Sequence, residues 1–129
     1  MSHIKRLADR GLISPPKWIP DNIVYEVITG SVAYGVSSDT SDMDVYAVAV
    51  PPRDEIFPHL RGELIGFGKQ KERFRVWQQH HISDPDALGG KGRNYDLCVY
   101  NIVDYFDLCM ENNPNMVDTL FVSEECVLH

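Results

Sequence analysis

The sequence lacks several features that would each assign it to a particular class of protein. No apolar run approaches the ~20 residues that a membrane-spanning helix needs. The N-terminal stretch MSHIKRLADRGLI carries charges where a signal peptide has an apolar segment. Internal repeats and low-complexity tracts are also absent. We therefore expect a cytoplasmic protein with no membrane partner, whose 129 residues suffice for one domain with a core.

Cysteine and positive charge are both scarce. The three cysteines, Cys98, Cys109 and Cys126, are an odd number without a CxxC pair, in mainly apolar surroundings. Buried free thiols are therefore expected rather than a disulfide or a zinc site. The 12 Lys and Arg face 19 Asp and Glu, which gives a net charge of −7 and argues against sequence-independent adhesion to nucleic acid. A nucleotide bound with Mg²⁺ remains compatible, because the metal offsets carboxylate and phosphate charge alike.

The chain does contain an alternation of strand and helix patterns. Runs rich in β-branched residues predict strands at 23–29, 43–50, 73–82 and 95–100, the last two antiparallel to each other. A short helix is expected at 3–10, followed by a proline-rich connector at 14–21, and residues 83–93 have the composition of a loop. The fold class is α/β (α+β), a small mixed β-sheet flanked by helices. Residues 1–22 form the helix and connector, and residues 23–129 form the core.

Two helices are predicted after the last strand. Asn101 can cap the first, with Asp104 placed as the acidic partner of a capping box. Asn113 can cap the second, and Pro114 suits its first turn. The apolar side of the first helix is expected to contain Ile102, Phe106 and Cys109 or Met110; that of the second is expected to contain Met116, Val117, Leu120 and Phe121.

Asp42 and Asp44 stand at the start of a strand that otherwise has the composition of a core strand. Residues i and i+2 of a strand point to one face, with Cα atoms roughly 6.6 Å apart. Two unpaired carboxylates there would repel each other, and a pair of divalent cations ~3.5–4 Å apart removes that penalty. Asp96, inside another apolar strand, is the candidate for a third carboxylate. The alternative is a polar turn, SSDTSD, with Asp42 as a cap and Asp44 on a solvated face.

Gly30 and Ser31 lie where the first predicted strand ends. Exposed N–H groups at such a turn bind phosphate, and glycine lets the backbone approach closely. Together with the carboxylates, this pair indicates a site that holds a nucleoside triphosphate with Mg²⁺ and directs an acceptor hydroxyl to the α-phosphorus.

The string GSVAYGVSSDTSDMDVYAV resembles the signature of the DNA polymerase β superfamily of nucleotidyltransferases. More narrowly, it resembles the predicted nucleotidyltransferases of the RNA-repair-pathway polymerase-β-like family of bacteria and their phages. The block YDLCVYNIVDYFDLCMENNPNMVDTLF (95–121) is similar to the second block of that family, so the resemblance covers roughly residues 23–128.

The resemblance implies a polymerase-β-like core with Mg²⁺ dependence and transfer of a nucleotide from an NTP, with Mn²⁺ as the alternative metal. It implies that Asp42, Asp44 and Asp96 are the catalytic metal ligands and that Gly30 and Ser31 hold the phosphates. Ser41 is assigned to nucleotide binding, as is Tyr34, for which packing behind the turn is an equal alternative. The expected acceptor is an RNA end. A protein hydroxyl, a small molecule, or a non-catalytic module that binds nucleotide or a partner are the alternatives.

Members of this family continue into a helical half, whereas this sequence stops at SEECVLH. We therefore expect an exposed apolar surface beside the second of the two helices. A C-terminal half, a second chain or a homo-oligomer contact would cover it.

Six further positions have simpler interpretations beside functional ones. His80 and His81 are adjacent on a strand, so one is expected to face the core and one the solvent, rather than both binding metal. Lys91 and Arg93 belong to a loop for which solvation is favoured over contact with phosphates or RNA. Trp18 and Trp77 are expected in the core or an interface.

Overall fold

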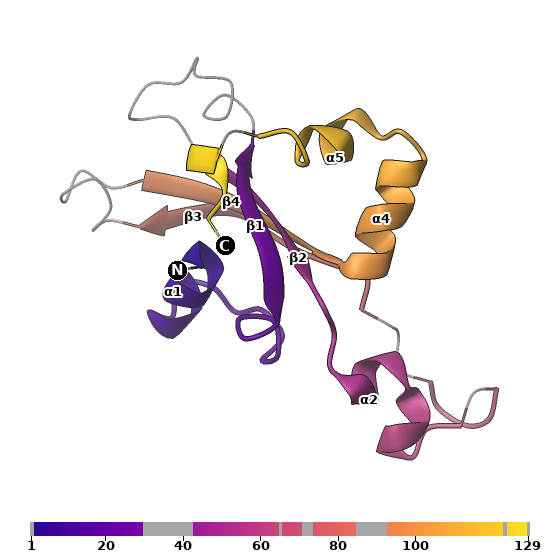
Figure 1. Ribbon diagram of the computed structural model, residues 1–129. Coiled ribbons are helices and arrows are strands. Elements are labelled where there is room, and N and C mark those ends of the chain that lie inside the picture. The colour runs from indigo at the N-terminus through magenta and orange to yellow at the C-terminus, as the bar shows by residue number, and fades with distance from the viewer. Residues whose placement is uncertain are drawn as a thin grey trace.

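Figure 1 shows the computed structural model, a four-stranded sheet with helices on both faces. The structure describes residues 2–29, 43–64, 66–70, 74–84, 93–122 and 124–128. The spatial order is β1-β2-β4-β3, with β1 antiparallel to β2, β3 antiparallel to β4, and the central pair β2 and β4 parallel. The strands are β1 (Ile23–Thr29), β2 (Met43–Ala49), β3 (Val76–Asp84) and β4 (Arg93–Asn101). This mixed sheet confirms the predicted fold class and the antiparallel pairing of the last two strands.

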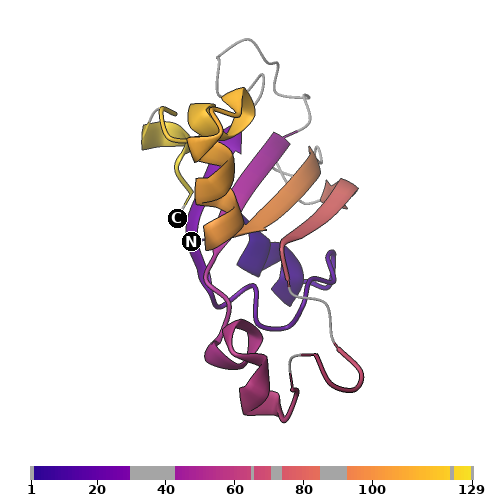
Figure 2. The ribbon, with the colours of Figure 1, turned by 90° about the vertical axis from the view of Figure 1, so that its right-hand side faces the viewer.

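One face of the sheet is covered by α1 (His3–Asp9) and holds the larger core. Ile4 and Leu7 of α1 are fully buried against alternate residues of the central strands, among them Val45, Ala47, Leu97 and Val99. Trp18 and Trp77 pack against this core, as the sequence predicted. Figure 2 looks onto the face of the sheet from the side of α4, which lies in front of the strands, with α1 behind them.

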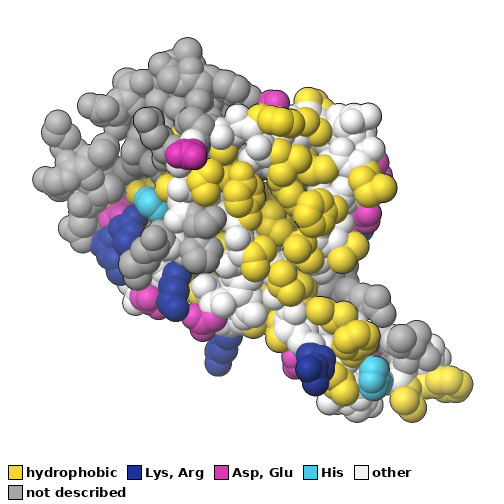
Figure 3. Space-filling model, in the orientation of Figure 1, with side chains coloured by type: hydrophobic (Ala, Val, Ile, Leu, Met, Phe, Trp, Pro, Cys, Tyr) yellow, Lys and Arg dark blue, Asp and Glu magenta, His cyan; other side chains and the backbone are white. Residues whose placement is uncertain are grey.

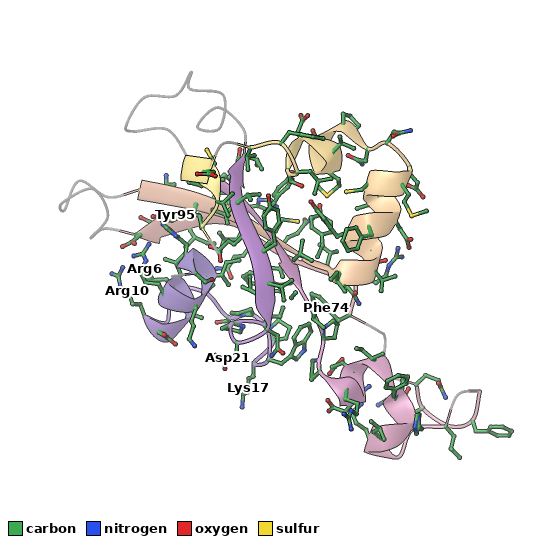
Figure 4. All side chains as sticks on the ribbon, in the orientation of Figure 1. Arg6, Arg10, Lys17, Asp21, Phe74 and Tyr95 are labelled. Carbon is green, nitrogen blue, oxygen red and sulfur yellow. The ribbon has the colours of Figure 1, made fainter. Side chains whose placement is uncertain are left out.

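Two buried carboxylates fix α1 to the sheet. Glu26 of β1 accepts a hydrogen bond from the Ser2 hydroxyl and one of 2.8 Å from the His3 N–H, so it satisfies a donor at the start of the helix. Asp84, at the end of β3, accepts hydrogen bonds from Arg6 (3.0 Å) and Arg10 (2.8 Å). In Figure 4 both arginines leave α1 on the side where Tyr95 of β4 lies.

The opposite face is covered by α4 (Ile102–Met110) and α5 (Pro114–Asp118). The caps are as predicted, since the Asn101 side chain accepts from the Val103 N–H (2.9 Å) and the Asn113 side chain accepts from the Asn115 N–H (3.1 Å). The capping box does not form. The Asn101 N–H donates to the Arg75 carbonyl (2.8 Å), and Asp104 instead pairs with the Arg75 guanidinium.

The apolar side of α4 differs from the prediction. Tyr105 is buried, and Ile102 and Cys109 pack beside it against Val48 and Met116. Phe106 and Met110, expected on this side, are 52% and 81% exposed. Tyr105 displaces Phe106 because its hydroxyl hydrogen-bonds the buried Thr119 hydroxyl (2.5 Å), which fixes the rotation of the helix about its axis. Of the residues predicted for the second helix, Met116 is buried, whereas Leu120 and Phe121 are 48% and 79% exposed.

Between β2 and β3 the chain forms an arm, residues 53–64 and 66–70, that projects away from the sheet in Figure 1. It contains α2 (Arg53–Ile56) and the 3₁₀-helix η1 (Pro58–Arg61). The Gln70 side chain closes its tip by donating to the carbonyls of Leu64 (2.6 Å) and Phe67 (2.9 Å). At the C-terminal end, the 3₁₀-helix η2 (Glu124–Cys126) leads to Val127, which bridges to Val27 of β1.

Cys98, Cys109 and Cys126 are free thiols as predicted, two of them buried. The expected loop at 83–93 is shorter than predicted, because β3 extends through Asp84 and β4 begins at Arg93. Within the described ranges, no helix has both the length and the apolar surface needed to cross a bilayer.

Candidate active site

A row of polar residues crosses all four strands at one end of the sheet. Asp44 of β2 is directly in register with Asp96 of β4, and Thr29 of β1 is the partner of Asp44 on the other side. On β3, the residues opposite Asp96 are His80 and His81, between the registered pairs Gln79↔Leu97 and Ile82↔Tyr95. Each of the two central strands, β2 and β4, therefore contributes one carboxylate to this row.

Both carboxylates point to the face that α4 and α5 cover. Neighbouring residues of a strand alternate between faces, and residues in register on adjacent strands share a face. Val45 and Leu97, which follow Asp44 and Asp96, are buried in the core under α1. Asp44 and Asp96 therefore lie together on the opposite face, on strands ~4.8 Å apart.

A β-bulge holds Asp96 in place. Two residues of β3 oppose one residue of β4, and His81 has a φ of 56°, in the left-handed region. Its N–H turns toward β4 and donates a hydrogen bond of 2.8 Å to Oδ1 of Asp96. His80 Nδ1 lies 3.7 Å from the same oxygen, and the Asp96 side chain is 27% exposed. Asp96 is thus oriented by the backbone and open to solvent.

The bulge overturns the expectation that His80 and His81 point to opposite faces, one into the core. Both side chains are exposed, because the extra residue interrupts the alternation of β3. A sequence signal for this exists. Trp77 and Ile82 both contact the core, yet five positions separate them, and an odd spacing between two residues on one face requires an additional residue.

The next two rows of the same face contain three weak acids, Tyr46 in register with Cys98 and then Tyr100 in register with Val48. Burial raises the pKa of Tyr46, with smaller contributions from the Cys98 thiol and the Asp44 carboxylate. Burial likewise raises the pKa of Cys98 and of Tyr100. These groups stay neutral at pH 7, so Asp44 and Asp96 are the acidic residues that give these three rows of β2 and β4 their charge.

Comparison with known proteins identifies the family of this chain. The family model described as "RNA repair pathway DNA polymerase beta family" matches residues 8–125, nearly the whole chain. The chain belongs to this family. Neither a curated protein nor a solved structure matches it. The family indicates a polymerase-β-like nucleotidyltransferase role in RNA repair.

The donor set fits a divalent cation of the kind that the RNA repair pathway DNA polymerase beta family is expected to use. Carboxylate oxygens are the ligands that Mg²⁺ prefers, and a cation between Asp44 and Asp96 would offset their mutual repulsion. Among the described residues, no group of three or more His, Cys, Asp or Glu side chains could hold a metal ion. The third predicted ligand, Asp42, lies outside the described residues, as do Gly30, Ser31, Tyr34, Ser41 and Lys91.

Proposed function

We propose that this chain transfers a nucleoside monophosphate from an NTP to an acceptor hydroxyl at an RNA end, with release of pyrophosphate. The observation that supports this most directly is the register of the central strands, which brings Asp44 and Asp96 side by side on one face. The family supplies the reaction class, and the partly exposed Asp96 carboxylate supplies a place where a phosphate-bound cation can arrive from solvent.

Asp44, Asp96 and Asp42 are the residues proposed to hold Mg²⁺ or Mn²⁺. Such ions would neutralise charge on the triphosphate and lower the pKa of the acceptor hydroxyl. The chain itself positions the two carboxylates. The His81 N–H limits rotation of the Asp96 carboxylate, and the in-register pairing of β2 and β4 fixes the spacing of the two aspartates. Gly30 and Ser31 are proposed to hold the phosphates, and Tyr34 and Ser41 to complete the nucleotide site.

The test measures pyrophosphate release and label transfer from each of the four NTPs to RNA with a free 3′ end, with and without Mg²⁺. Asp44→Asn and Asp96→Asn should each lower the rate by at least ~100-fold. Both variants should remain folded, because replacing one carboxylate by an amide also removes a like-charge repulsion. Asp54→Asn, on the exposed surface of α2, is the matched control and should keep the parent rate within twofold.

The outcomes separate the alternatives. Full Mg²⁺-dependent activity in both site variants would refute the metal-site assignment. Calorimetric binding of NTP with Mg²⁺ but no pyrophosphate release with any acceptor would identify a binding module instead of an enzyme. Label found on protein or on a small molecule, with none on RNA, would correct the acceptor.

A further inference from the structure

The solvent-facing side of α4 is apolar. Val103, Phe106 and Met110 are spaced i, i+3, i+7, which places them on one stripe of the helix, and their exposed fractions are 64%, 52% and 81%. The inner side of the same helix is apolar as well, with Tyr105 buried against the sheet. A helix that is apolar on both sides is normally covered on both sides. The stripe Val103–Phe106–Met110 is called here the outer stripe.

Carboxylates follow the outer stripe along one flank. Asp104, Asp107 and Glu111 repeat the same i, i+3, i+7 spacing. They line a hollow of about 360 Å³ between α4 and the β3–β4 edge of the sheet. Arg75 shares this hollow and pairs with Asp104 at 3.3 Å. The hollow is therefore bordered by three acidic side chains and one basic side chain.

The charge of the chain is segregated toward this region. Residues 94–129 contain seven Asp or Glu and no Lys or Arg, whereas residues 1–93 contain 12 of each sign. The whole net charge of −7 therefore comes from the segment that includes α4 and α5. In Figure 3, hydrophobic side chains gather on the face over α4, α5 and the adjoining strands, and no Lys or Arg colour interrupts that area.

We propose that the outer stripe and its acidic flank dock an amphipathic helix of a partner protein, whose apolar side carries residues such as Leu and whose flank carries Lys or Arg. Apolar residues of the partner would cover Phe106 and Met110, and a cationic side chain would enter the hollow of Asp107 and Glu111. A second copy of this chain fits poorly, because a two-fold interface would bring the acidic flanks of the two copies together. Nucleic acid is disfavoured by the same charge. This proposal is independent of the proposed reaction.

The test uses the full chain and three synthetic 18-residue peptides. One is an amphipathic helix of Leu and Lys, the second has Glu at every Lys position, and the third has the Leu/Lys composition in an order without an apolar side. Calorimetry should give micromolar binding for the first peptide and at least 10-fold weaker binding for the other two. Amide shifts in nuclear magnetic resonance spectra should concentrate on residues 102–111.

Variants locate the surface. The double substitution F106Q/M110Q should weaken binding of the first peptide by at least 10-fold. Phe67 of the arm is 75% exposed, so Phe67→Gln is the matched control and should change binding by less than twofold. The double substitution D107N/E111Q should also weaken binding of the first peptide and reduce the salt dependence of that binding, with Asp54→Asn as the control for charge alone. Circular dichroism checks that each variant is folded.

Several results would overturn the proposal. Equal binding of the Lys and Glu peptides, absence of binding, or shifts outside α4 would each do so. Sedimentation of the chain alone as a dimer that F106Q/M110Q dissociates would assign the surface to a second copy instead.

Discussion

Replacing both of the arginines that bind Asp84 is expected to destabilise the fold by more than the sum of the two single effects. Asp84 has a side chain that is 0% exposed, while Arg6 and Arg10 are 35% and 32% exposed. Each arginine donates a charge-assisted hydrogen bond to Asp84, of a kind worth ~1.5–3 kcal/mol. Because about a third of each arginine side chain is exposed to water, the cost of Arg6→Met or Arg10→Met alone is discounted to ~1–2 kcal/mol. Methionine keeps the apolar stem of the arginine.

The double variant removes both guanidinium groups from a fully buried carboxylate. Breaking such a buried interaction costs ~3–5 kcal/mol, so the coupling between the two positions should be about 1 kcal/mol. At roughly 4 °C per kcal/mol for a domain of this size, the melting temperature should fall by ~12–20 °C. Arg6→Met should be the more damaging single change, since Arg6 also donates to the Tyr95 hydroxyl at 3.3 Å.

Urea unfolding followed by tryptophan fluorescence and circular dichroism measures this cycle. Lys5→Gln is the matched control, because Lys5 lies on the same helix and pairs with Asp21 at the surface, where ion pairs contribute little. Strictly additive effects, or a double variant as stable as the parent, would show that the arginines do not act together on Asp84.

Three further predictions follow from local geometry. His81→Gly should preserve or slightly raise stability, because glycine adopts the left-handed backbone freely, whereas His81→Val should cost ~1–2 kcal/mol of stability. Equal urea midpoints for the two variants would contradict the role of the bulge. Asn113→Ala should cost ~1 kcal/mol by removing the cap of α5, and an unchanged melting temperature would refute this. Burial raises the folded-state pKa of Tyr46 and Tyr100 above the unfolded value near 10, so their contribution to stability is complete below that pH and is lost as the pH rises toward the folded pKa. Absorbance at 295 nm should show that these tyrosines ionise at a higher pH than free tyrosine. Normal titration of all tyrosines would contradict this prediction.

Composition and periodicity predicted most of the fold, because strands rich in β-branched residues and helix caps are local signals. The bounds of β1 are those predicted, and Asn101 and Asn113 cap the helices as expected. The same local signals could not fix how α4 is rotated. Phe106 fits the apolar period as well as Tyr105 does, and the contact with Thr119, fourteen residues from Tyr105, decides between them.

The candidate site was predicted in part for a similar reason. Two aspartates in apolar strands are visible in the sequence, and the parallel register of β2 and β4 brings Asp44 and Asp96 together. The composition of residues 83–93 predicts a loop, yet Asp84 belongs to β3 because it pairs with Arg93 of β4, and its carboxylate binds Arg6 and Arg10 of α1. The hydrogen bond from His81 depends on a bulge, which only the odd spacing of core residues on β3 signals. The roles of Asp42, Gly30 and Ser31 stay predictions.

The arm between β2 and β3 makes the spacing of the two aspartates independent of the length of chain that joins them. Asp44 and Asp96 are held by strand pairing, while the connection runs out of the sheet, folds on itself through α2 and η1, and returns at the edge strand. Lengthening an excursion of this kind adds closure entropy only slowly. The tip at Gly66–Gly68 is therefore a natural insertion point, where a reporter domain or an affinity tag could be placed without disturbing the paired carboxylates.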